Sequence, residues 1–336
     1  MKNLLIMSTA LVAVASVAQA AEPLKASVGG YMFVGVGAND IDGQDSSIGV
    51  LRDGEIHFKV KGSSDNGLTF DGKVELEAWS QGGDIIDENW ARVSGSFGSI
   101  KIGADDHASY NLATGVIYFM GAHIGAYDAF GESGGPAAFV SNNRFGDDIG
   151  VYYNTPNFNG FQAEISWQPN GSSDGSGDSN SLVTDNNAAA NNNQISIGLN
   201  YQGEFNGVEI RLSGGWDYVD ELGGNGGSSE DAFMAGAQIG YMGFVLGGHY
   251  KQALVAGDTD DYVGNIGYKT GPWGFGLQYA RIEQDLAGGY EVDKFAGWVT
   301  YALAPGVSVG LGVEHQNSDG ANSDGTAGMA VMSLGF

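Results

Sequence analysis

The 336-residue sequence contains no cysteine and few basic residues. Without cysteine, disulfide frameworks and thiolate catalysis are excluded, so an exported chain of this size must be stabilised by backbone hydrogen bonds and packing. Lysine and arginine together number 14, against 40 aspartates and glutamates. Because a nucleic-acid partner requires basic residues that neutralise phosphates, this balance argues against nucleic-acid binding. It favours cations, either as permeants or as bridges to anionic lipid.

Long apolar runs are also scarce, since only the N-terminal segment has one. Lys2 precedes the largely apolar stretch Leu4–Val17, and Ala18-Gln19-Ala20 provides a cleavage site of small residues. We therefore expect a signal peptide over residues 1–20 and a single mature domain over residues 21–336; a retained membrane anchor is the alternative. Since a membrane-spanning helix needs roughly 20 apolar residues, the mature chain does not have the pattern of a helical membrane protein.

The remaining composition is rich in glycine and aromatic residues, with 57 glycines, 16 phenylalanines, 15 tyrosines, six tryptophans and only six prolines. The mean hydropathy is −0.12. Without Lys2 the mature chain has 40 acidic against 13 basic residues, a formal net charge of −27. A polar average with many aromatic residues is expected of a membrane barrel, whose lipid-facing apolar residues alternate with polar residues of the lumen.

The dominant pattern is an alternation of apolar and polar residues with period two. In the run 55–61, the even positions are apolar and the odd positions are Glu55, His57, Lys59 and Lys61. The run 68–79 repeats this alternation over twelve residues. An amphipathic helix would space its apolar residues by three and four, so these runs predict strands. No charged residue occupies the apolar face of the six most regular runs.

About sixteen such runs cover the chain. They lie near 26–38, 55–61, 68–79, 89–95, 99–104, 147–154, 161–168, 194–201, 208–217, 232–241, 244–253, 261–269, 274–282, 292–302, 307–314 and 327–336. The run 292–302 cannot be oriented, because Lys294 and Trp298 share a parity. Tight turns alternate with long acidic loops along the chain, which is the asymmetry expected of outer-membrane barrels.

Many aromatic residues fall near the ends of the apolar faces, where the interfacial girdles of a membrane barrel lie. Alternatively, they are ordinary strand-forming residues of a soluble β protein. An all-apolar face opposite a charged face instead indicates lipid on one side and water on the other. In hydrocarbon every backbone group must be paired internally, so the sheet must close, and about sixteen strands leave an aqueous channel. The predicted fold is all-β: a transmembrane antiparallel β-barrel of about 16 strands with short periplasmic turns and long external loops.

Three segments carry a family resemblance. Arg144–Phe161 begins with an arginine and contains a Thr155-Pro156 turn before a Gly160-Phe161 restart. Ser96–Gly103 has a strand-turn-strand pattern, and Met332–Phe336 ends in an aromatic residue after alternating apolar ones. In these features the mature chain resembles the trimeric general porins of Gram-negative bacteria. The resemblance implies a homotrimeric channel.

The sequence departs from the family pattern at two wall positions. Glu55-Ile56-His57-Phe58-Lys59 stands where the family has an R-x-x-F-K arrangement, and Gly103-Ala104 stands where it often has Gly-Arg. Two wall arginines of the family are therefore missing. The resemblance further implies that the third loop, residues 105–143, folds into the lumen as a constriction loop; an external flap is the alternative.

Strand parity and the resemblance together give candidate constriction residues. The wall candidates are Arg92, Lys101, Arg144, Glu55, Lys59, Lys73 and Asp148. The loop candidates are Asp105, Asp106, Asp128 and Glu132. Opposite charges on wall and loop would create a transverse field that orients dipolar solutes. Alternatively, each charged residue is simply a solvated lumen side chain.

Ion preference follows from where the charges lie. Parity places nine basic and nine acidic side chains on the lumen face, so the wall is expected to be nearly neutral and the acid excess to lie in the loops. Fixed negative charge at the outer mouth raises the local cation concentration, which predicts weak cation selectivity.

Metal and enzyme signals are weak. Asp40, Asp42 and Asp45 could hold Ca²⁺ through carboxylate oxygens, although they lack the twelve-residue spacing with a closing glutamate, and a solvated acidic loop is the alternative. No other cofactor is expected. The chain has no G-x-S-x-G, Walker or H-E-x-x-H motif, so no enzymatic activity is predicted.

The sequence as a whole predicts a porin of the bacterial outer membrane. It would form a water-filled channel for passive diffusion of small hydrophilic solutes and ions, in contact with the lipid bilayer and lipopolysaccharide. The alternatives are a substrate-selective channel of the same architecture and a non-channel surface β protein.

Overall fold

The computed structural model describes residues 21–43, 45–78, 85–117, 146–171, 192–221, 229–254, 259–284, 289, 291–319 and 324–336. This part of the chain forms sixteen β-strands and one short helix, α1 (Ala108–Asn111), between β5 and β6. The strands are β1 (Glu22–Ile41), β2 (Ser47–Ser63), β3 (Thr69–Glu77), β4 (Ile86–Gly95), β5 (Gly98–Ala104), β6 (Ile149–Asn154), β7 (Phe161–Asn170), β8 (Asn192–Phe205), β9 (Val208–Glu221), β10 (Glu230–Tyr241), β11 (Phe244–Leu254), β12 (Thr259–Thr270), β13 (Trp273–Gln284), β14 (Glu291–Ala304), β15 (Val307–Asp319) and β16 (Gly325–Gly335).

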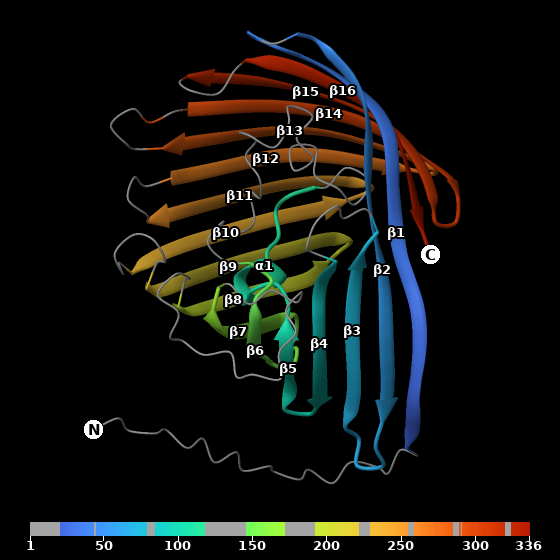
Figure 1. The fold of residues 1–336 in the computed structure, drawn as a ribbon, viewed down its shortest axis with the longest axis vertical. Helices are drawn as coiled ribbons and strands as arrows, with labels where there is room; N and C mark the ends of the chain where they lie inside the picture. The colour runs from blue at the N-terminus through green and yellow to red at the C-terminus, as the bar shows by residue number, and fades with distance from the viewer. Residues whose placement is uncertain are drawn as a thin grey trace.

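The sixteen strands form one closed antiparallel barrel, in which each strand pairs with its neighbours in sequence (Figure 1). The barrel closes where β1 pairs with β16, in a register that runs from Tyr31↔Gly335 to Ile41↔Gly325. Beyond this ladder, Gly30 and Phe336 exchange two backbone hydrogen bonds of 3.0 and 3.1 Å. The sequence prediction of a closed barrel of about sixteen strands is confirmed.

The alternation of side chains separates an apolar outer face from a polar inner face. On β8, Leu199 points outward and is 55% exposed, whereas Gln194 and Ser196 point inward and are buried. The run that could not be oriented follows the same rule, since Phe295 of β14 is exposed and Lys294 is buried. Trp298 shares the parity of Lys294 and packs with the buried inward-facing cluster around Phe33. Lys294 and Trp298 therefore both face the lumen.

Short turns join the strands at one end of the barrel. Asn206-Gly207 connects β8 to β9, and Met242-Gly243 connects β10 to β11, with all four residues at positive φ between 48° and 84°. Two consecutive left-handed residues form the type I′ turn that matches the right-handed twist of paired strands.

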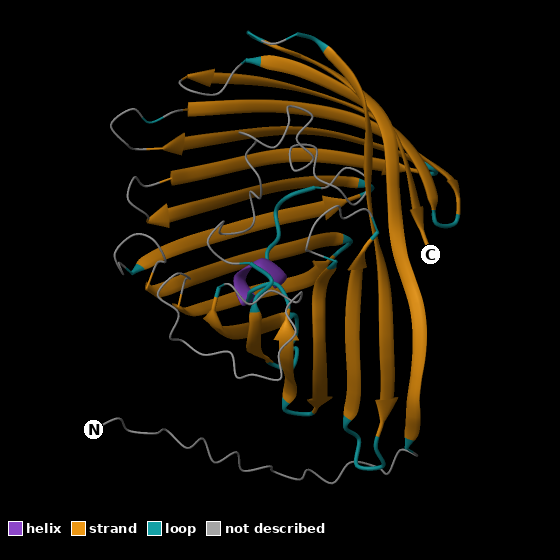
Figure 2. Ribbon diagram, viewed as in Figure 1, coloured by secondary structure: helices purple, strands orange, loops and turns teal. Residues whose placement is uncertain are grey.

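One segment leaves the wall and runs inside the barrel. Residues 105–117, here called the inner segment, follow the short strand β5 and include α1, which Figure 2 shows within the ring of strands. Its helix contacts β7, β8 and β9. Nowhere in the described residues is there a helix long and apolar enough to cross a membrane.

A charged side chain on the lipid-facing side of the wall should destabilise the barrel. Replacing Leu199, which lies midway along β8, by arginine (Leu199→Arg) is expected to lower the free energy of unfolding in lipid vesicles by about 2–4 kcal/mol. Asn200→Arg, one residue along and facing the lumen, should change it by no more than about 0.5 kcal/mol. Urea titrations of both variants in vesicles check the difference, and equal losses would contradict the assignment of the two faces.

Candidate functional site

The inner segment is fastened to the wall by side chains of β7, β8 and β9. The backbone N–H of Ala108 donates to Ser166 Oγ at 3.1 Å, and that of Ser109 donates to Ser196 Oγ at 2.8 Å. The backbone N–H of Thr114 donates to Ser213 Oγ at 2.9 Å. Wall hydroxyls thus satisfy the backbone donors of the first helical residues, which have no intrahelical acceptor, and one further donor beyond the end of the helix.

Further along, amide and imidazole side chains of the wall bind the carbonyl oxygens of the inner segment. Asn265 Nδ2 of β12 donates to the carbonyl of Gly115 at 2.7 Å. Nδ1 of His249, on β11, lies 2.9 Å from the carbonyl oxygen of Thr114. Val116 then packs against an inward-facing apolar cluster of β12–β14, formed by Val263, Ala280, Ile282 and Val292. The inner segment is therefore held by polar contacts with β7–β9, β11 and β12 and by apolar contacts with β12–β14.

A buried ionisable group anchors the start of the segment. Asp217 of β9 is fully buried and accepts hydrogen bonds from Ser109 Oγ at 2.7 and 2.9 Å. His107 Nε2 lies 3.7 Å from Asp217 Oδ2. Burial lowers the pKa of His107, and although Asp217 opposes this effect, Lys251 adds to it. His107 is therefore held mainly as the neutral imidazole.

Three wall cations surround one indole ring. The centroid of the Trp90 ring lies 5.6 Å from Lys73 Nζ, 5.1 Å from Arg92 Cζ and 5.7 Å from Lys101 Nζ. At such distances a cation is attracted to the face of an aromatic ring. Lys101 also lies 4.4 Å from the ring of Tyr152.

Each of these cations also has a carboxylate partner. Arg92 forms a two-point pair with Asp71, with distances of 3.1 and 2.6 Å. Lys73 lies 2.8 Å from Glu75 and 2.5 Å from Glu88. Lys101 contacts the carboxylate of Asp105 in the inner segment. The sequence predicts that wall cations face loop acids across the lumen. Arg92 and Lys73 instead pair with carboxylates of the wall itself, because neighbours on the same and adjacent strands are closer than the loop.

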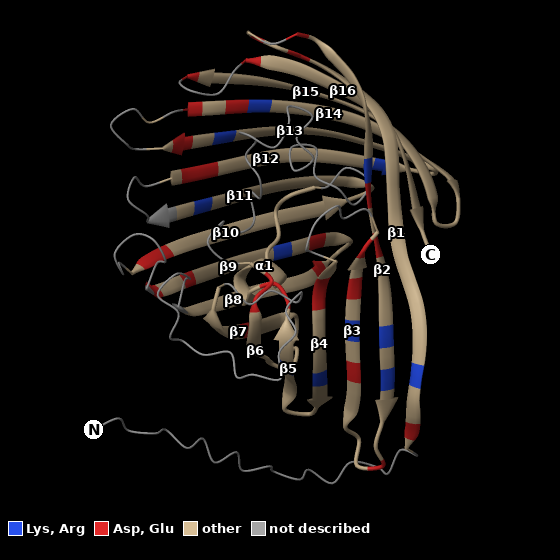
Figure 3. Cartoon of the chain, viewed as in Figure 1, with Lys and Arg blue, Asp and Glu red and all other residues tan. Residues whose placement is uncertain are grey.

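A cluster of carboxylates lies beside these pairs, where β2, β3 and β4 meet the inner segment. Its members lie in overlapping groups whose ligand atoms are within 4.8 Å of one another, and they are Glu55, Glu75, Glu77, Asp87, Glu88, Asp106 and Asp147, with His57. Figure 3 shows red segments at the ends of β3 and β4 next to the segment that carries α1. Oxygen-rich groups such as Glu88, Asp106 and Asp147 have the chemistry that hard divalent cations prefer.

The crowding of the carboxylates affects their protonation. Burial raises the pKa of Asp106 well above its ordinary range, and the nearby charges of Asp147 and Glu88 add to this effect. A bound cation or a shared proton would relieve the repulsion between such neighbours.

The family model described as "Gram-negative porin" matches residues 8–321. This chain belongs to the Gram-negative porin family. A comparison with curated protein sequences gives no match.

The fold of this porin is similar to those of several solved outer-membrane proteins. The anion-selective porin from Comamonas acidovorans has a TM-score of 0.72 and 15% identity over 94% of this chain and all of the other. OprB of Pseudomonas putida has a TM-score of 0.70 and 9% identity, covering 93% of this chain and 94% of the other. OmpF of Salmonella typhi, in complex with daunomycin, has a TM-score of 0.65 and 14% identity, covering 94% and 98%. At such identities the likeness concerns the fold alone.

Other predicted site residues of the porin occupy different environments. Lys59 lies exposed on β2, directly opposite Lys73 in the register. Asp148 is only 3% exposed and accepts a hydrogen bond from Gln194 Nε2 at 2.9 Å, so it joins two parts of the wall rather than lining open lumen. Arg144, Asp128 and Glu132 lie outside the described residues.

The calcium candidates lie at the loop end of β1. Asp40 accepts a hydrogen bond from Ser46 Oγ at 2.8 Å, and the backbone N–H of Asp42 donates to the carbonyl of Asp324. Within the described ranges, the groups of side chains spaced to share a metal ion do not include Asp40, Asp42 or Asp45.

Sequence reasoning missed the central residues of the charged wall. Glu88 precedes the run 89–95 that parity could orient, and a register shift between Val74 and Leu76 of β3 interrupts the alternation there. Trp90 falls on the polar parity of its strand, which was the available signal, yet an indole there resembles an ordinary β-former. Asp217 has the polar parity of the run 208–217, but parity does not predict its contact with Ser109, since that contact depends on the path of the inner segment.

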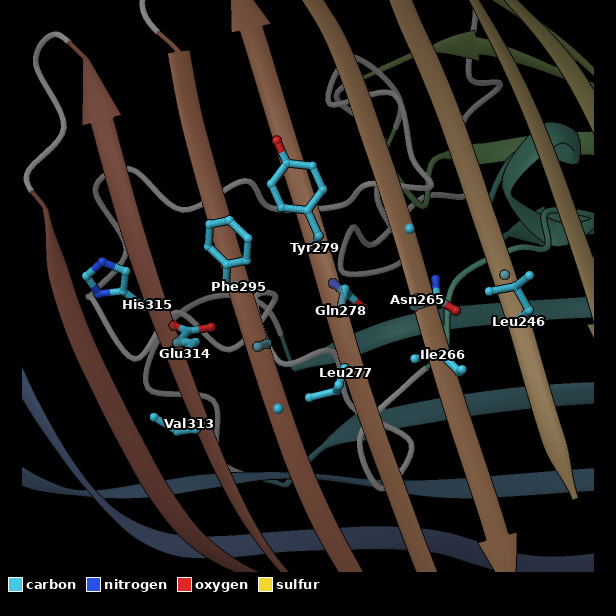
Figure 4. Close-up of a pocket in the computed structure, with 14 residues that line it drawn as sticks. Leu246, Asn265, Ile266, Leu277, Gln278, Tyr279, Phe295, Val313, Glu314 and His315 are labelled. Carbon is cyan, nitrogen blue, oxygen red and sulfur yellow. The ribbon is translucent and has the colours of Figure 1, made fainter.

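An apolar groove of about 750 Å³ lies on the other side of the wall, over β11–β15 (Figure 4). Leu246, Ile266, Leu277, Phe295 and Val313 line it and belong to the exposed outer face. Its position on the lipid-facing surface makes it part of the membrane contact of the porin rather than of the pore.

Neutral His107 should make the stability of the porin depend on pH. Because the folded-state pKa is lowered, the unfolded chain takes up a proton near its ordinary pKa of about 6.5 that the folded protein does not, so stability is lost as pH falls below that value. Each unit between the two pKa values contributes about 1.4 kcal/mol. The urea midpoint of the native porin should therefore fall more between about pH 7.5 and pH 5.5 than that of His107→Gln. His315→Gln, at an exposed histidine of β15, serves as the control, and parallel slopes for all three proteins would rule out the effect.

Proposed function

We propose that this porin forms a water-filled channel for passive diffusion of small hydrophilic solutes and ions across the outer membrane. The observation that carries the proposal is the closed sixteen-stranded barrel with charged side chains on its inner face and apolar ones on its outer face. A barrel of about this size is too wide for wall side chains to fill. The proposed channel needs no cofactor and no catalytic residue.

The inner segment is proposed to begin a constriction loop over residues 105–143. Support comes from its fastening to β7–β12, which fills that side of the lumen, and from its contact with the charged wall through Lys101 and Asp105. Solutes would then pass close to the carboxylate cluster and to the cations around Trp90. Fixed charges at a narrow passage act on permeating ions more strongly than charges in open water.

The channel is proposed to prefer cations weakly. Arg92, Lys73 and Lys101 are paired with carboxylates, whereas the cluster that includes Glu55 and Glu77 holds more carboxylates than basic side chains. Further carboxylates face inward at Asp53, Glu88, Glu230 and Asp261, while Lys294 joins the bases, so the wall is more acidic than the nine-to-nine balance of the sequence analysis. The anion selectivity of the Comamonas acidovorans porin does not bear on this preference, because the likeness is one of fold at 15% identity.

Planar-bilayer recordings test the channel and its preference together. Purified porin should give stepwise conductance, and its reversal potential in a low-salt gradient should have the sign of a cation-preferring pore. The double variant Glu55→Gln/Glu77→Gln should move the reversal potential toward zero, because it removes two carboxylates of the cluster. Asp319→Asn, at an exposed carboxylate of β15, is the control. Absence of conductance would refute the channel, and an anion-preferring native pore would refute the selectivity.

Aromatic residues on the outer face support contact with outer-membrane lipid. Trp216 Nε1 donates to Asp231 at 2.7 Å, and the hydroxyls of Tyr250 and Tyr279 donate to Asp260 and Asp293 at 2.6 Å. These donors lie toward the loop ends of β9, β11 and β13, where an outer-leaflet girdle is expected. The carboxylates beside them fit the proposed bridging of phosphorylated lipid, including lipopolysaccharide, by divalent cations.

The distribution of these aromatic residues also supports the proposed homotrimer. Within the described strands, every outward-facing tyrosine and tryptophan lies on β6–β14, whereas the outer face of β15, β16 and β1–β5 carries neither. This arc, here called the Tyr/Trp-free arc, presents small residues such as Gly72 and Ala91 together with exposed apolar residues such as Phe58 and Phe70. Small residues let two membrane surfaces approach closely. We infer that the Tyr/Trp-free arc contacts other copies of the chain. OmpT of Vibrio cholerae, whose fold is similar at a TM-score of 0.63 and 12% identity, has a trimer form.

A bulky substitution distinguishes an intersubunit face from a lipid-facing one. Ala91→Trp, on the exposed face of β4, should shift the porin from trimers to monomers, because a tryptophan cannot fit between closely packed copies. Leu246→Trp, on the outer face of β11, should leave the trimer intact, since lipid adapts to its shape. Light scattering of the purified proteins measures both masses, and a trimeric Ala91→Trp would exclude this arc as the contact.

A further inference from the structure

We propose that four glycines of the inner wall, Gly198, Gly215, Gly236 and Gly247, are positioning residues that set how far the inner segment projects into the lumen. They lie on the neighbouring strands β8, β9, β10 and β11, directly behind the segment. The inference rests on the proposed channel function and specifies which wall residues determine the width of the passage.

The distances leave no space for a side chain between wall and segment. A methyl group at Gly236 would lie 1.9 Å from the carbonyl oxygen of Thr114, and one at Gly198 would lie 2.2 Å from that of Ala108. At Gly247 the corresponding distance to the carbonyl oxygen of Gly115 is 2.4 Å. All three contacts are with backbone atoms, which cannot rotate away as the end of a flexible side chain could. Even alanine at these positions would therefore displace the segment.

Contact at Gly215 involves a side chain of the helix. A methyl group there would lie 2.5 Å from Ser109 Cβ. Gly198 and Gly215 stand opposite each other in the register of β8 and β9, so together they form a flat area under α1. The helix can rest there close enough for Ser109 Oγ to reach the buried carboxylate of Asp217.

Each of the other two glycines stands beside a side chain that binds the segment. Gly236 is opposite Ser213, the acceptor of the Thr114 N–H. Gly247 is opposite Asn265, the donor to the Gly115 carbonyl. A short side chain can reach the segment only if the adjacent position leaves the backbones close together. The glycines thus make the hydrogen bonds geometrically possible.

The segment meets the wall with a glycine of its own. Gly115 has a φ of +107°, and a methyl group on it would lie 2.1 Å from the carbonyl oxygen of Gly248. Both the conformation and the space at this position require glycine. The close approach therefore requires glycine both in the wall and in the inner segment. If the wall glycines served only to let the wall curve, there would be no reason for a glycine in the segment.

Channel recordings test the role of the glycines in setting the width. Gly236→Val should push the segment toward the barrel axis and reduce the unit conductance of the porin. Gly264→Val is the control for the glycine-to-valine change itself, because Gly264 lies on the outer face of the next strand but one, away from the inner segment, and a methyl group there meets nothing within 4 Å. The control should conduct as the native porin does. If Gly236→Val has the same unit conductance as Gly264→Val, the inference is overturned.

A chemical reporter follows the segment independently of conductance. Since the chain has no cysteine, Ser109→Cys introduces a single thiol at a position that is 1% exposed. The thiol should resist a water-soluble thiol reagent in the folded porin and in Gly264→Val, but react in Gly215→Val, whose added side chain lifts the helix from the wall. Labelling is measured on the folded fraction, separated by its heat-modifiable mobility, so that misfolding does not mimic exposure. A thiol that stays protected in Gly215→Val contradicts the proposal.

The two measurements separate this inference from the function on which it rests. If native porin does not conduct, the channel proposal fails, while the thiol reporter still tests the seating of the segment. If native porin conducts but both glycine variants behave as Gly264→Val does, the channel stands and the positioning role is refuted.

Discussion

In hydrocarbon an unpaired backbone N–H or C=O group costs several kcal/mol, so a membrane sheet is stable only when it has no free edge. The pairing of β1 with β16 removes both edges of this porin. Once the sheet is closed, its two faces meet different solvents, and the alternation of side chains assigns each residue to one of them. The charged wall, the inner segment and the aromatic girdle all follow from that separation.

The inner face does not contact lipid, and its two sides differ in the side chains they carry. On β2–β5 it brings charges of both signs together, so that Arg92 pairs with Asp71 and Lys101 lies between two aromatic rings and Asp105. On β7–β12 it carries glycines beside hydroxyl and amide side chains, which bind the backbone of the inner segment. The side of the lumen formed by β2–β5 therefore carries the charged groups, and the side formed by β7–β12 holds the inner segment.

The fold was predictable from the sequence because alternation with period two is a local signal that repeats along every strand. The site was predictable only where parity alone decides orientation, as for Arg92 and Lys101. Pairing partners could not be foreseen, since the contact of Lys73 with Glu88 depends on the register of β3 with β4, which shifts beside Val74. The contact of Ser109 with Asp217 joins residues 108 positions apart through a segment without periodicity. Sequence patterns carry no information on such a path.

The seam between β1 and β16 joins two strands at opposite ends of the described chain, so the ring cannot be completed while either strand is still missing. Contacts of such long sequence separation form slowly, because a large loop entropy must be overcome first. An exported chain must therefore remain soluble and unassembled until it meets the membrane. Its abundant negative charge gives mutual repulsion during that delay, and a chain without cysteine cannot form disulfide-linked misfolded species. The low content of lysine, arginine and cysteine therefore affects the unassembled polypeptide as well as the closed barrel.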